Sequence, residues 1–310
     1  MVILMKSSHR KTLLAIGGPT GVGKTDLAIA LARHYQTEII NADSRQVYRE
    51  LTIGVNKPTA EQLAEVTHHL VGHRSIQEHY NAGMFEEDAL SIIESLFRKH
   101  ELVVLVGGTG LYFKAVLKGM DEFPEVTPDL KARIEELYHR EGLQGLQERV
   151  QDVDPDYFKS VDQKNPRRLT RALEVYYASG IPISQWRSNS WKKRNFEHIP
   201  VFIHDERQIV YDRIDRRVDQ MISQGLKKEV ESLLPFRHLK SLETVGYREW
   251  WDHFDGNMDE RSVIEKIKQH TRNYAKRQWT WWKPLQWPSF KPDELSVLIR
   301  HIEQALGNKG

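Results

Sequence analysis

The sequence contains no cysteine in its 310 residues. Disulfide bonds and thiolate metal sites are therefore excluded, and any bound metal is expected to be a hard cation held by oxygen, which points to Mg²⁺. No apolar run approaches the roughly 20 residues that cross a bilayer, and the first apolar stretch is too short for a secretory signal. We therefore expect a cytoplasmic protein without a membrane partner.

Charge of either sign is not in large excess, because the formal net charge is only +2. With 39% hydrophobic and 28% charged residues, the chain has the composition of an ordinary globular protein. Its basic residues are nevertheless clustered in "NPRRLTR", "WKKR", "RIDRRV" and "RNYAKRQWTWWK". One such cluster is usually a solvated surface, but several clusters interleaved with aromatic residues favour the binding of nucleic acid.

Short apolar runs alternate with helical stretches in the first third of the chain. The run "TLLAIGG" (12–18) predicts a buried strand that enters a loop, and "TEIINAD" and "ELVVLVGG" predict two more strands. Stretches of helical periodicity fill the intervals. The pattern predicts an α/β fold, doubly wound around a parallel sheet, whose ligand binds at the carboxyl ends of the strands.

The pattern changes near Asp121, where helical stretches punctuated by proline replace the strands. Strand-like sequence returns at "HIPVFIHD" (198–205), and a long helix is predicted for 262–282. We predict that residues 121–195 form a helical insertion that contacts RNA. Residues 1–120 and 196–310 are then predicted to form the α/β core with a helical C-terminal part.

The segment "GPTGVGKT" (18–25) matches the phosphate-loop pattern G-x-x-x-x-G-K-[ST] between a predicted strand and a predicted helix. Its glycines let the backbone point N–H groups at phosphate oxygens, Lys24 adds a positive charge, and the Thr25 hydroxyl can bind Mg²⁺. The motif predicts a P-loop NTPase-like core but does not say which phosphate compound is bound. The predicted phosphate ligands are Gly18, Pro19, Thr20, Gly21, Val22, Gly23, Lys24 and Thr25.

A carboxylate is missing where an ATPase of this class would have one. The strand "LVVLV" is followed by "GGTG" (107–110), in which Thr109 can contact phosphate or cap a helix but cannot polarise water. Asp43 instead follows the second strand, where it can bind Mg²⁺, accept a proton from a nucleophile, or merely cap a helix. This arrangement argues against hydrolysis, although small-molecule kinases also carry an aspartate here.

Three arginines crowd the predicted start of a helix in "NPRRLTR". With the asparagine as cap and the proline in the first turn, the cations of Arg167, Arg168 and Arg171 oppose the helix dipole at a cost of about 0.3–1 kcal/mol each. Glu174 can pair with Arg171. The first two arginines therefore indicate an external anion, such as RNA phosphate.

Two further basic segments lie in the C-terminal part. Arg213, Arg216 and Arg217 have i, i+3 and i+4 spacing, so they can present a guanidinium fork to a diphosphate or pair with aspartates of the same helix. The last segment is predicted to place three cations on roughly one helical face beside aromatic rings, a combination suited to single-stranded RNA. These cations are Arg272, Lys276 and Arg277.

Seven segments, taken in order, resemble the tRNA dimethylallyltransferase (tRNA isopentenyltransferase) family. They are "GPTGVGKT", "NADSRQVY", "HYNAGMFEEDA", "LVGGTGLYFKAVLKG", "NPRRLTRALEVY", "VGYREWW" and "RNYAKRQWTWW", and they extend over nearly the whole chain. The resemblance implies a P-loop core with a helical insertion. It also implies transfer of a dimethylallyl group from dimethylallyl diphosphate to the exocyclic amine of the adenosine 3′-adjacent to the anticodon in tRNA, with release of diphosphate.

The resemblance also implies roles for individual residues. Lys24 and the loop would hold the diphosphate with Thr25 on Mg²⁺, Asp43 would take a proton from the amine, and Thr109 and Arg217 would steady the leaving diphosphate. Contacts with the anticodon stem-loop are predicted in both parts of the chain. In the core they are Asp43, Ser44, Arg45, Gln46, Thr109, Leu242, Gly246, Tyr247, Arg248, Arg272, Lys276 and Arg277. In the insertion they are Lys131, Arg133, Arg167, Arg168, Leu169, Thr170 and Arg171.

Two positions depart from the family pattern. Val55 stands in "IGVNKP" where the family commonly has threonine, and Gly72 stands where it commonly has aspartate. Three alternatives remain open on sequence grounds: a small-molecule or nucleoside kinase, a free-adenylate isopentenyltransferase, and a non-enzymatic, nucleotide-gated RNA-binding protein. We also expect the protein to be a monomer.

Reversing the charge of both Arg167 and Arg168 to glutamate is expected to weaken RNA binding. Each lost phosphate contact should reduce the slope of log affinity against log salt by about 1. Filter binding of unmodified tRNA over a salt series measures both effects. An affinity that does not respond to the substitutions would contradict the argument from the helix start.

Overall fold

In the computed structural model, the described residues, 11–187 and 191–307, form two compact units. The first, named the core, comprises the described residues up to Lys118 and those from Lys193 onward. The second, named the insertion, is Gly119–Lys192. Every helix among the described residues is too short or too polar to cross a bilayer.

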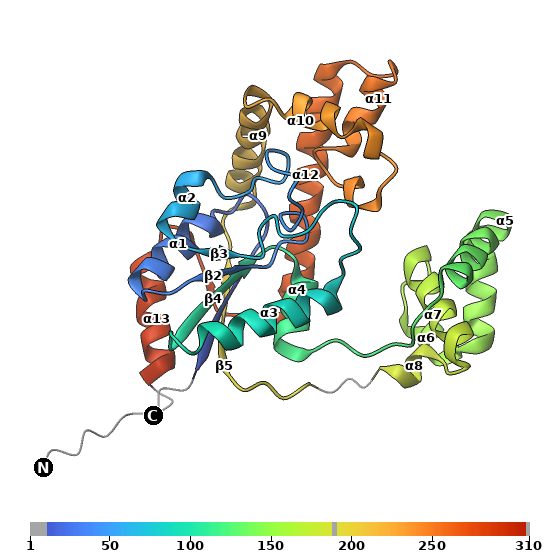
Figure 1. Cartoon of the computed structure of the whole chain (residues 1–310), viewed down its shortest axis with the longest axis horizontal. Coiled ribbons are helices and arrows are strands. Elements are labelled where there is room, and N and C mark those ends of the chain that lie inside the picture. The colour runs from blue at the N-terminus through green and yellow to red at the C-terminus, as the bar shows by residue number, and fades with distance from the viewer. Residues whose placement is uncertain (1–10, 188–190, 308–310) are drawn as a thin grey trace, which may run out of the picture. The chain divides into compact units, whose positions relative to one another are not determined.

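The core is built on a six-stranded parallel sheet with the strand order β3-β2-β4-β1-β5-β6 (Figure 1). The predicted α/β fold with a parallel sheet is confirmed. The strands β3 and β6 were not predicted, because each spans only two residues and shows no periodicity. The strands are β1 (Thr12–Gly17), β2 (Ile39–Asn41), β3 (His68–His69), β4 (Leu102–Gly107), β5 (Glu197–Ile203) and β6 (Ser289–Phe290).

Helices fill the connections between strands, and the C-terminal part of the core is mostly helical (Figure 1). The core helices are α1 (Lys24–His34), α2 (Ala60–Glu65), α3 (Ala82–Leu96), α4 (Gly110–Lys118), α9 (Arg207–Ser223), α10 (Leu226–Ser232), α11 (Trp251–Phe254), α12 (Glu260–Trp282) and α13 (Leu295–Gly307). Four 3₁₀ turns accompany them: η1 (Leu234–Phe236), η2 (Lys240–Leu242), η3 (Arg248–Trp250) and η4 (Lys283–Leu285).

One apolar cluster holds the sheet to its helices. Alternate residues of β1 and β5, among them Ile16 and Val201, are fully buried together with Leu31 of α1 and Leu298 of α13. A strand buried in this way contributes a nearly continuous apolar sequence, which is why β1 and β4 were readily predicted. Burying each large aliphatic side chain stabilises the fold by about 1.5–3 kcal/mol.

Three strand ends meet at the middle of the sheet and position the polar residues. Because β2, β4 and β1 are neighbours, the loops that follow their carboxyl ends lie side by side. The pairing continues past the strand ends, since Ala42 N donates to Val106 O at 2.7 Å and Thr109 N donates to Ala42 O at 3.2 Å. The phosphate loop, Asp43 and the 107–110 loop are brought together in this way.

The insertion has its own apolar core, formed by the helices α5 (Pro128–Val153), α6 (Pro155–Ser160), α7 (Pro166–Ser179) and α8 (Ile183–Trp186). Asn165 caps α7 by accepting from Arg168 N at 3.3 Å, as the sequence predicted. Leu169 is fully buried in this core. The prediction that its side chain contacts RNA is therefore wrong, because i+3 and i+4 spacing turns it toward the other helices.

Candidate active site

The phosphate loop joins β1 to α1 at the centre of the sheet. Gly21 and Gly23 have φ angles of 81° and 99°, which residues with a side chain rarely adopt. Gly23 is also the N-cap of α1 and offers no side chain to bond the first turn. The N–H groups at the start of this helix are therefore left for a ligand, and the helix dipole favours an anion there.

A cavity of about 320 Å³ lies over the phosphate loop and is named the loop chamber. Five of the eight predicted phosphate ligands line it: Thr20, Gly21, Gly23, Lys24 and Thr25. The side chain of Val22 is instead fully buried in the apolar cluster of the core, because the loop turns it away from the chamber. The Pro19 carbonyl accepts a hydrogen bond from Lys24 Nζ at 2.6 Å.

A second cavity of about 240 Å³ adjoins the first and is named the acceptor chamber. Residues of α12 and of the 243–248 segment line it, including Tyr274, Arg277 and Arg248. Five residues line both chambers: Thr20, Asp43, Val55, Asn56 and Arg217. The sequence-predicted carboxylate and one predicted cation thus stand at the boundary between the two spaces.

Two cations and one carboxylate set the electrostatics of this boundary. Burial lowers the pKa of Lys24 to about 7, Arg217 acts in the same direction, and Asp43 opposes them. Burial also lowers the pKa of Arg217, against the effect of Asp43. The Arg217 side chain donates from Nη2 to Thr20 Oγ1 at 2.8 Å, but its buried Nε has no partner among the described residues. The site therefore has positive charge and a free donor to offer an anion.

Asp43 uses one carboxylate oxygen for local structure. Its Oδ1 accepts from Arg45 N at 2.8 Å and from Gln46 N at 3.3 Å. The residues that follow form a turn and not a helix, so this oxygen stabilises a turn where the sequence allowed a helix cap. Within the described residues, Oδ2 has no recorded hydrogen bond. The cap therefore orients the carboxylate and leaves its other oxygen for chemistry.

Thr109 supports the neighbouring loop. Its Oγ1 accepts from Ser44 N at 3.0 Å and donates to Ser44 Oγ at 3.3 Å. Ser44 lines the acceptor chamber, whereas the 107–110 loop reaches the loop chamber through Gly107 and Gly108. A direct contact of Thr109 with diphosphate remains a prediction.

Gln278 is a site residue that sequence reasoning missed. This buried amide accepts from Thr20 N at 2.7 Å and donates to Gly108 O at 2.9 Å, which ties the phosphate loop to the loop after β4. A Cβ on Gly108 would overlap Gln278 Nε2, so a larger residue there would displace the amide from its hydrogen bond with the Gly108 carbonyl. The available signal was a polar residue in the buried stripe of α12, between Ala275 and Trp282.

Glu229 and Tyr247 fix a wall of the acceptor chamber. The Glu229 carboxylate accepts from Ile53 N at 2.8 Å, Gly54 N at 3.2 Å and the Tyr247 hydroxyl at 2.5 Å. Tyr247 and Leu242 are fully buried, which corrects the prediction that their side chains contact RNA. Tyr247 packs against Gly54 and bonds to Glu229, which holds the segments that carry Gly54, Gly246 and Arg248 at the chamber.

The other predicted RNA contacts of the core separate into groups. Ser44, Arg45, Gly246, Arg248 and Arg277 line the acceptor chamber, and Gln46 lines the loop chamber. Arg272 is held by Asp215 at 2.5 and 2.7 Å. Lys276 lines a different cavity from Arg277, because consecutive helical residues point about 100° apart. The prediction that Arg272, Lys276 and Arg277 share one face is therefore wrong.

The arginine fork predicted on α9 forms only in part. Arg217 lines both chambers and Arg213 lines the loop chamber, where it also pairs with Asp205 at 2.8 Å. Arg216 is exposed and its Nε donates to the Asp212 carbonyl at 3.3 Å. Arg213 and Arg217 thus reach the site, and Arg216 does not.

The predicted residues of the insertion lie mainly on its surface. Lys131 and Arg133 of α5 are exposed, as are Arg167 and Arg168 at the start of α7. Arg171 pairs with Glu174 at 3.1 Å, as the sequence allowed. Thr170 is half-buried on the same helix. Lys131, Arg133 and Arg168 thus present their cations at the surface.

The fold and the site together define a phosphate-loop α/β protein in which the loop chamber adjoins the acceptor chamber. The model of the IPP transferase family matches residues 46–284. A tRNA dimethylallyltransferase of Christiangramia forsetii is 42% identical over 288 residues, which cover 92% of this chain and 95% of the relative. The chain therefore belongs to the IPP transferase family, which confirms the resemblance of its motifs.

Solved structures agree with this assignment. The full-length tRNA isopentenylpyrophosphate transferase of Bacillus halodurans is 32% identical, with a TM-score of 0.72 over 97% of this chain and 98% of that one. A eukaryotic dimethylallyltransferase described as acting on tRNA is 24% identical, with a TM-score of 0.81 over 96% of this chain and 80% of that one. The second likeness supports the fold, including the P-loop NTPase-like core.

The affinity for inorganic diphosphate is expected to fall as the pH rises above about 7. The free protein has a Lys24 pKa of about 7, and a bound anion raises that pKa. Between pH 7 and the raised pKa, binding of diphosphate is therefore accompanied by uptake of a proton on Lys24. In this range the affinity falls by at most tenfold per pH unit. Below pH 7 Lys24 is already charged, and the affinity no longer depends on its protonation. Calorimetry in two buffers of different ionisation enthalpy measures this uptake. Equal uptake by the native protein and Lys24→Met would contradict the assignment.

Gln278→Glu is expected to weaken diphosphate binding by about tenfold. The glutamate keeps the acceptor for Thr20 N but places a carboxylate against the Gly108 carbonyl, so the two loops are no longer tied, at a cost of about 1–3 kcal/mol. Titration with inorganic diphosphate and Mg²⁺, at a temperature where circular dichroism shows a folded protein, is the measurement. Gln304→Leu, on the exposed side of α13, is the control and should bind normally.

Proposed function

We propose that the protein transfers a dimethylallyl group from dimethylallyl diphosphate to the exocyclic amine of the adenosine 3′-adjacent to the anticodon in tRNA. The observation that carries the proposal is the position of Asp43 and Arg217 in the shared boundary of the two chambers. A diphosphate in the loop chamber and a base in the acceptor chamber would meet there. Membership of the IPP transferase family supports the same chemistry.

The proposed reaction breaks the allylic C–O bond, and its electron pair stays on the diphosphate oxygen. The loop N–H groups, Lys24 and Arg217 stabilise the charge that grows on the diphosphate, and such preorganised donors are usually the largest contribution to catalysis. The amine nitrogen forms the new bond to the allylic carbon. Its proton passes to Asp43 Oδ2, which needs only to lie within hydrogen-bond reach.

The acceptor chamber is suited to a flipped base. Burial, reinforced by Asp43, raises the pKa of Tyr274 to about 12, so its phenol stays neutral beside the developing allylic cation. An aromatic ring attracts a cation without quenching it. A base that fills the chamber excludes water, which would otherwise capture the allyl group, and this explains the need for a whole RNA loop.

A divalent cation, which we propose to be Mg²⁺, fits the oxygen donors of the loop chamber. Thr25 lines it and offers a hydroxyl oxygen, and no cluster of three histidine, aspartate or glutamate side chains among the described residues forms a closed metal cage. Mg²⁺ is commonly held by one or two protein oxygens together with substrate phosphates. When bound, it neutralises part of the diphosphate charge.

The RNA contacts are proposed on two surfaces. Arg45, Arg248 and Arg277 line the acceptor chamber and would receive the backbone around the flipped adenosine. Arg167 and Arg168 of the insertion would bind phosphates elsewhere in the anticodon stem-loop.

Incubation of the protein with unmodified tRNA and radiolabelled dimethylallyl diphosphate, with and without Mg²⁺, tests the proposed function. Release of phosphate from ATP without label in RNA would instead support a kinase or hydrolase.

Asp43→Asn is expected to lower turnover by about 10²–10⁴-fold, because the amide cannot accept the proton. Binding of tRNA and of diphosphate should persist, since the asparagine oxygen can still cap the turn at Arg45 and Gln46. Single-turnover labelling measures the chemical step, and titrations measure binding. Near-normal turnover would eliminate the role of Asp43 as base.

A further inference from the structure

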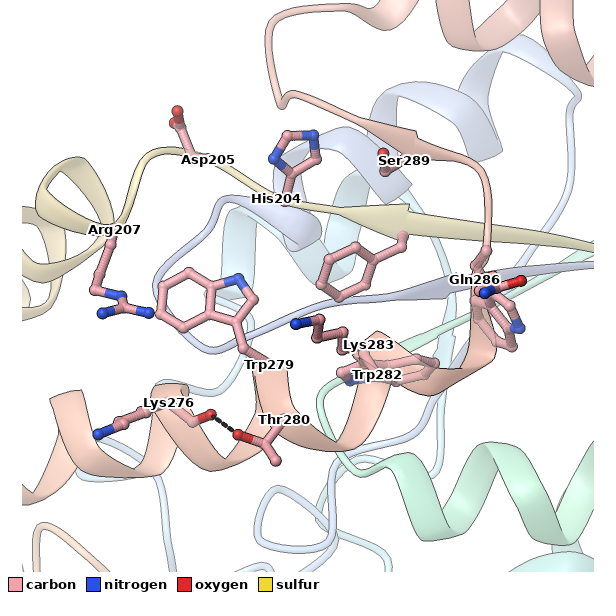
Figure 2. Close-up of a pocket in the computed structure, with 12 residues that line it drawn as sticks. His204, Asp205, Arg207, Lys276, Trp279, Thr280, Trp282, Lys283, Gln286 and Ser289 are labelled. Carbon is pink, nitrogen blue, oxygen red and sulfur yellow. Dashed lines mark hydrogen bonds between the residues drawn. The ribbon is translucent and has the colours of Figure 1, made fainter.

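Figure 2 shows a third cavity, of about 640 Å³, beside the C-terminal end of α12. The residues of α12 that line it differ from those that line the acceptor chamber. The cavity is formed by the carboxyl end of β5 with the segment that leads into α9, by the last turns of α12, by the η4 turn with the loop that follows, and by the first residue of β6. None of the residues that line it lines the loop chamber or the acceptor chamber. The activity proposed above therefore makes no use of this cavity.

Aromatic rings make up much of its wall. Trp279, Trp282, Trp287 and Phe202 line the cavity. The ring centroids of Trp282 lie 4.8 Å from those of Trp287 and 6.1 Å from those of Phe202. Trp282 is buried, whereas the other three keep part of their surface exposed. Rings that only filled the apolar core would be covered on all sides. The exposed parts of these three rings are therefore available for stacking on a planar ligand.

The polar groups of the cavity are predominantly positive. Arg207, Lys276 and Lys283 are exposed, and among the described residues none of the three forms an ion pair. The one carboxylate in the wall, Asp205, is already paired with Arg213 at 2.8 Å. Figure 2 shows the Arg207 side chain directed toward Trp279, with Asp205 pointing away. The cavity therefore combines π faces with unneutralised cations.

The loop that closes the cavity is conformationally costly. Gln286 has φ 50° and ψ 36°, in the left-handed region that residues other than glycine seldom adopt. Pro284 and Pro288 flank it and restrict the same loop. Such conformations cluster at binding sites, where they hold a side chain in a required place. Here the residues held at the cavity are Gln286, Trp287 and Ser289.

We propose that this cavity binds a single nucleotide, with its base stacked on the tryptophan rings and its phosphate among Arg207 and Lys283. A purely apolar ligand would gain nothing from the cations, and a simple anion would gain nothing from the rings. The volume lies within the roughly 300–1,000 Å³ of small-molecule pockets. Gln286 and Ser289 offer hydrogen bonds to the edge of the base. The nucleotide is either a free mononucleotide or one unit of a bound RNA strand.

The first arm of the test titrates the protein with AMP. Saturating inorganic diphosphate and Mg²⁺ are present throughout, so that the phosphate loop is filled. We expect saturable binding that Trp279→Ala and Lys283→Glu each weaken by about tenfold, since stacking on one aromatic ring has this order of effect. Trp279→Phe should restore most of the affinity because it keeps a ring. Because diphosphate fills the phosphate loop throughout, AMP binding to that loop does not contribute to the titration.

The second arm measures the affinity for an unmodified anticodon stem-loop. If AMP does not bind but the same two substitutions weaken RNA binding by about tenfold, the cavity holds a nucleotide of the RNA. Lys99→Glu is the charge-matched control, because Lys99 is exposed beyond the end of α3 and just before β4 begins, at the opposite edge of the sheet from the ligands. Normal binding of both AMP and RNA by Lys283→Glu and by folded Trp279→Ala would overturn the proposal.

Discussion

The site depends on an excess of half-buried positive charge. Lys24 and Arg217 are both partly withdrawn from bulk water, which lowers the pKa of each, and the carboxylate of Asp43 opposes this effect at both. Taking a charge out of water is costly unless a partner compensates it, so the site favours any ligand that brings several negative oxygens. A diphosphate supplies them, and a diphosphate that gains charge as it leaves supplies more. The same electrostatic imbalance therefore accounts for both binding and catalysis.

Such an imbalance is useful only if the donors stay in place when the charge develops. The strand order makes the loops after β1, β2 and β4 neighbours, and Gln278 joins the first of them to the third through two hydrogen bonds. Asp43 is oriented by the turn that it caps, and Thr109 holds the adjacent Ser44. Asp43 and Thr20 at the boundary of the two chambers are thus held by backbone or buried partners, which is the condition for preorganisation.

The helix α12 organises three surfaces at once. Gln278 contacts the loops at the carboxyl ends of the strands, Arg277 lines the acceptor chamber, and Lys276 lines the third cavity, next to Trp279 and Trp282. Because consecutive residues on a helix point about 100° apart, a single basic and aromatic segment serves different sites. Tryptophans of the same segment also fill space that glycines leave open: a Cβ on Gly17 would lie 2.3 Å from the Trp282 ring. The basic and aromatic residues of this segment are adjacent in the sequence, but they line different sites in the structure.

The sequence by itself determined the α/β class, the phosphate loop, Asp43 as the carboxylate after the second strand, and the helical character of residues 121–195. These features are local, since a glycine-rich loop or a buried strand is specified by adjacent residues. Only the tertiary structure shows that Gln278 couples two loops, that Leu242 and Tyr247 are buried, and which cavities Lys276 and Arg277 line. These properties depend on contacts between different segments of the chain: Thr20 and Gln278, for example, are 258 positions apart. Helical spacing says which residues share a face, but not what that face meets.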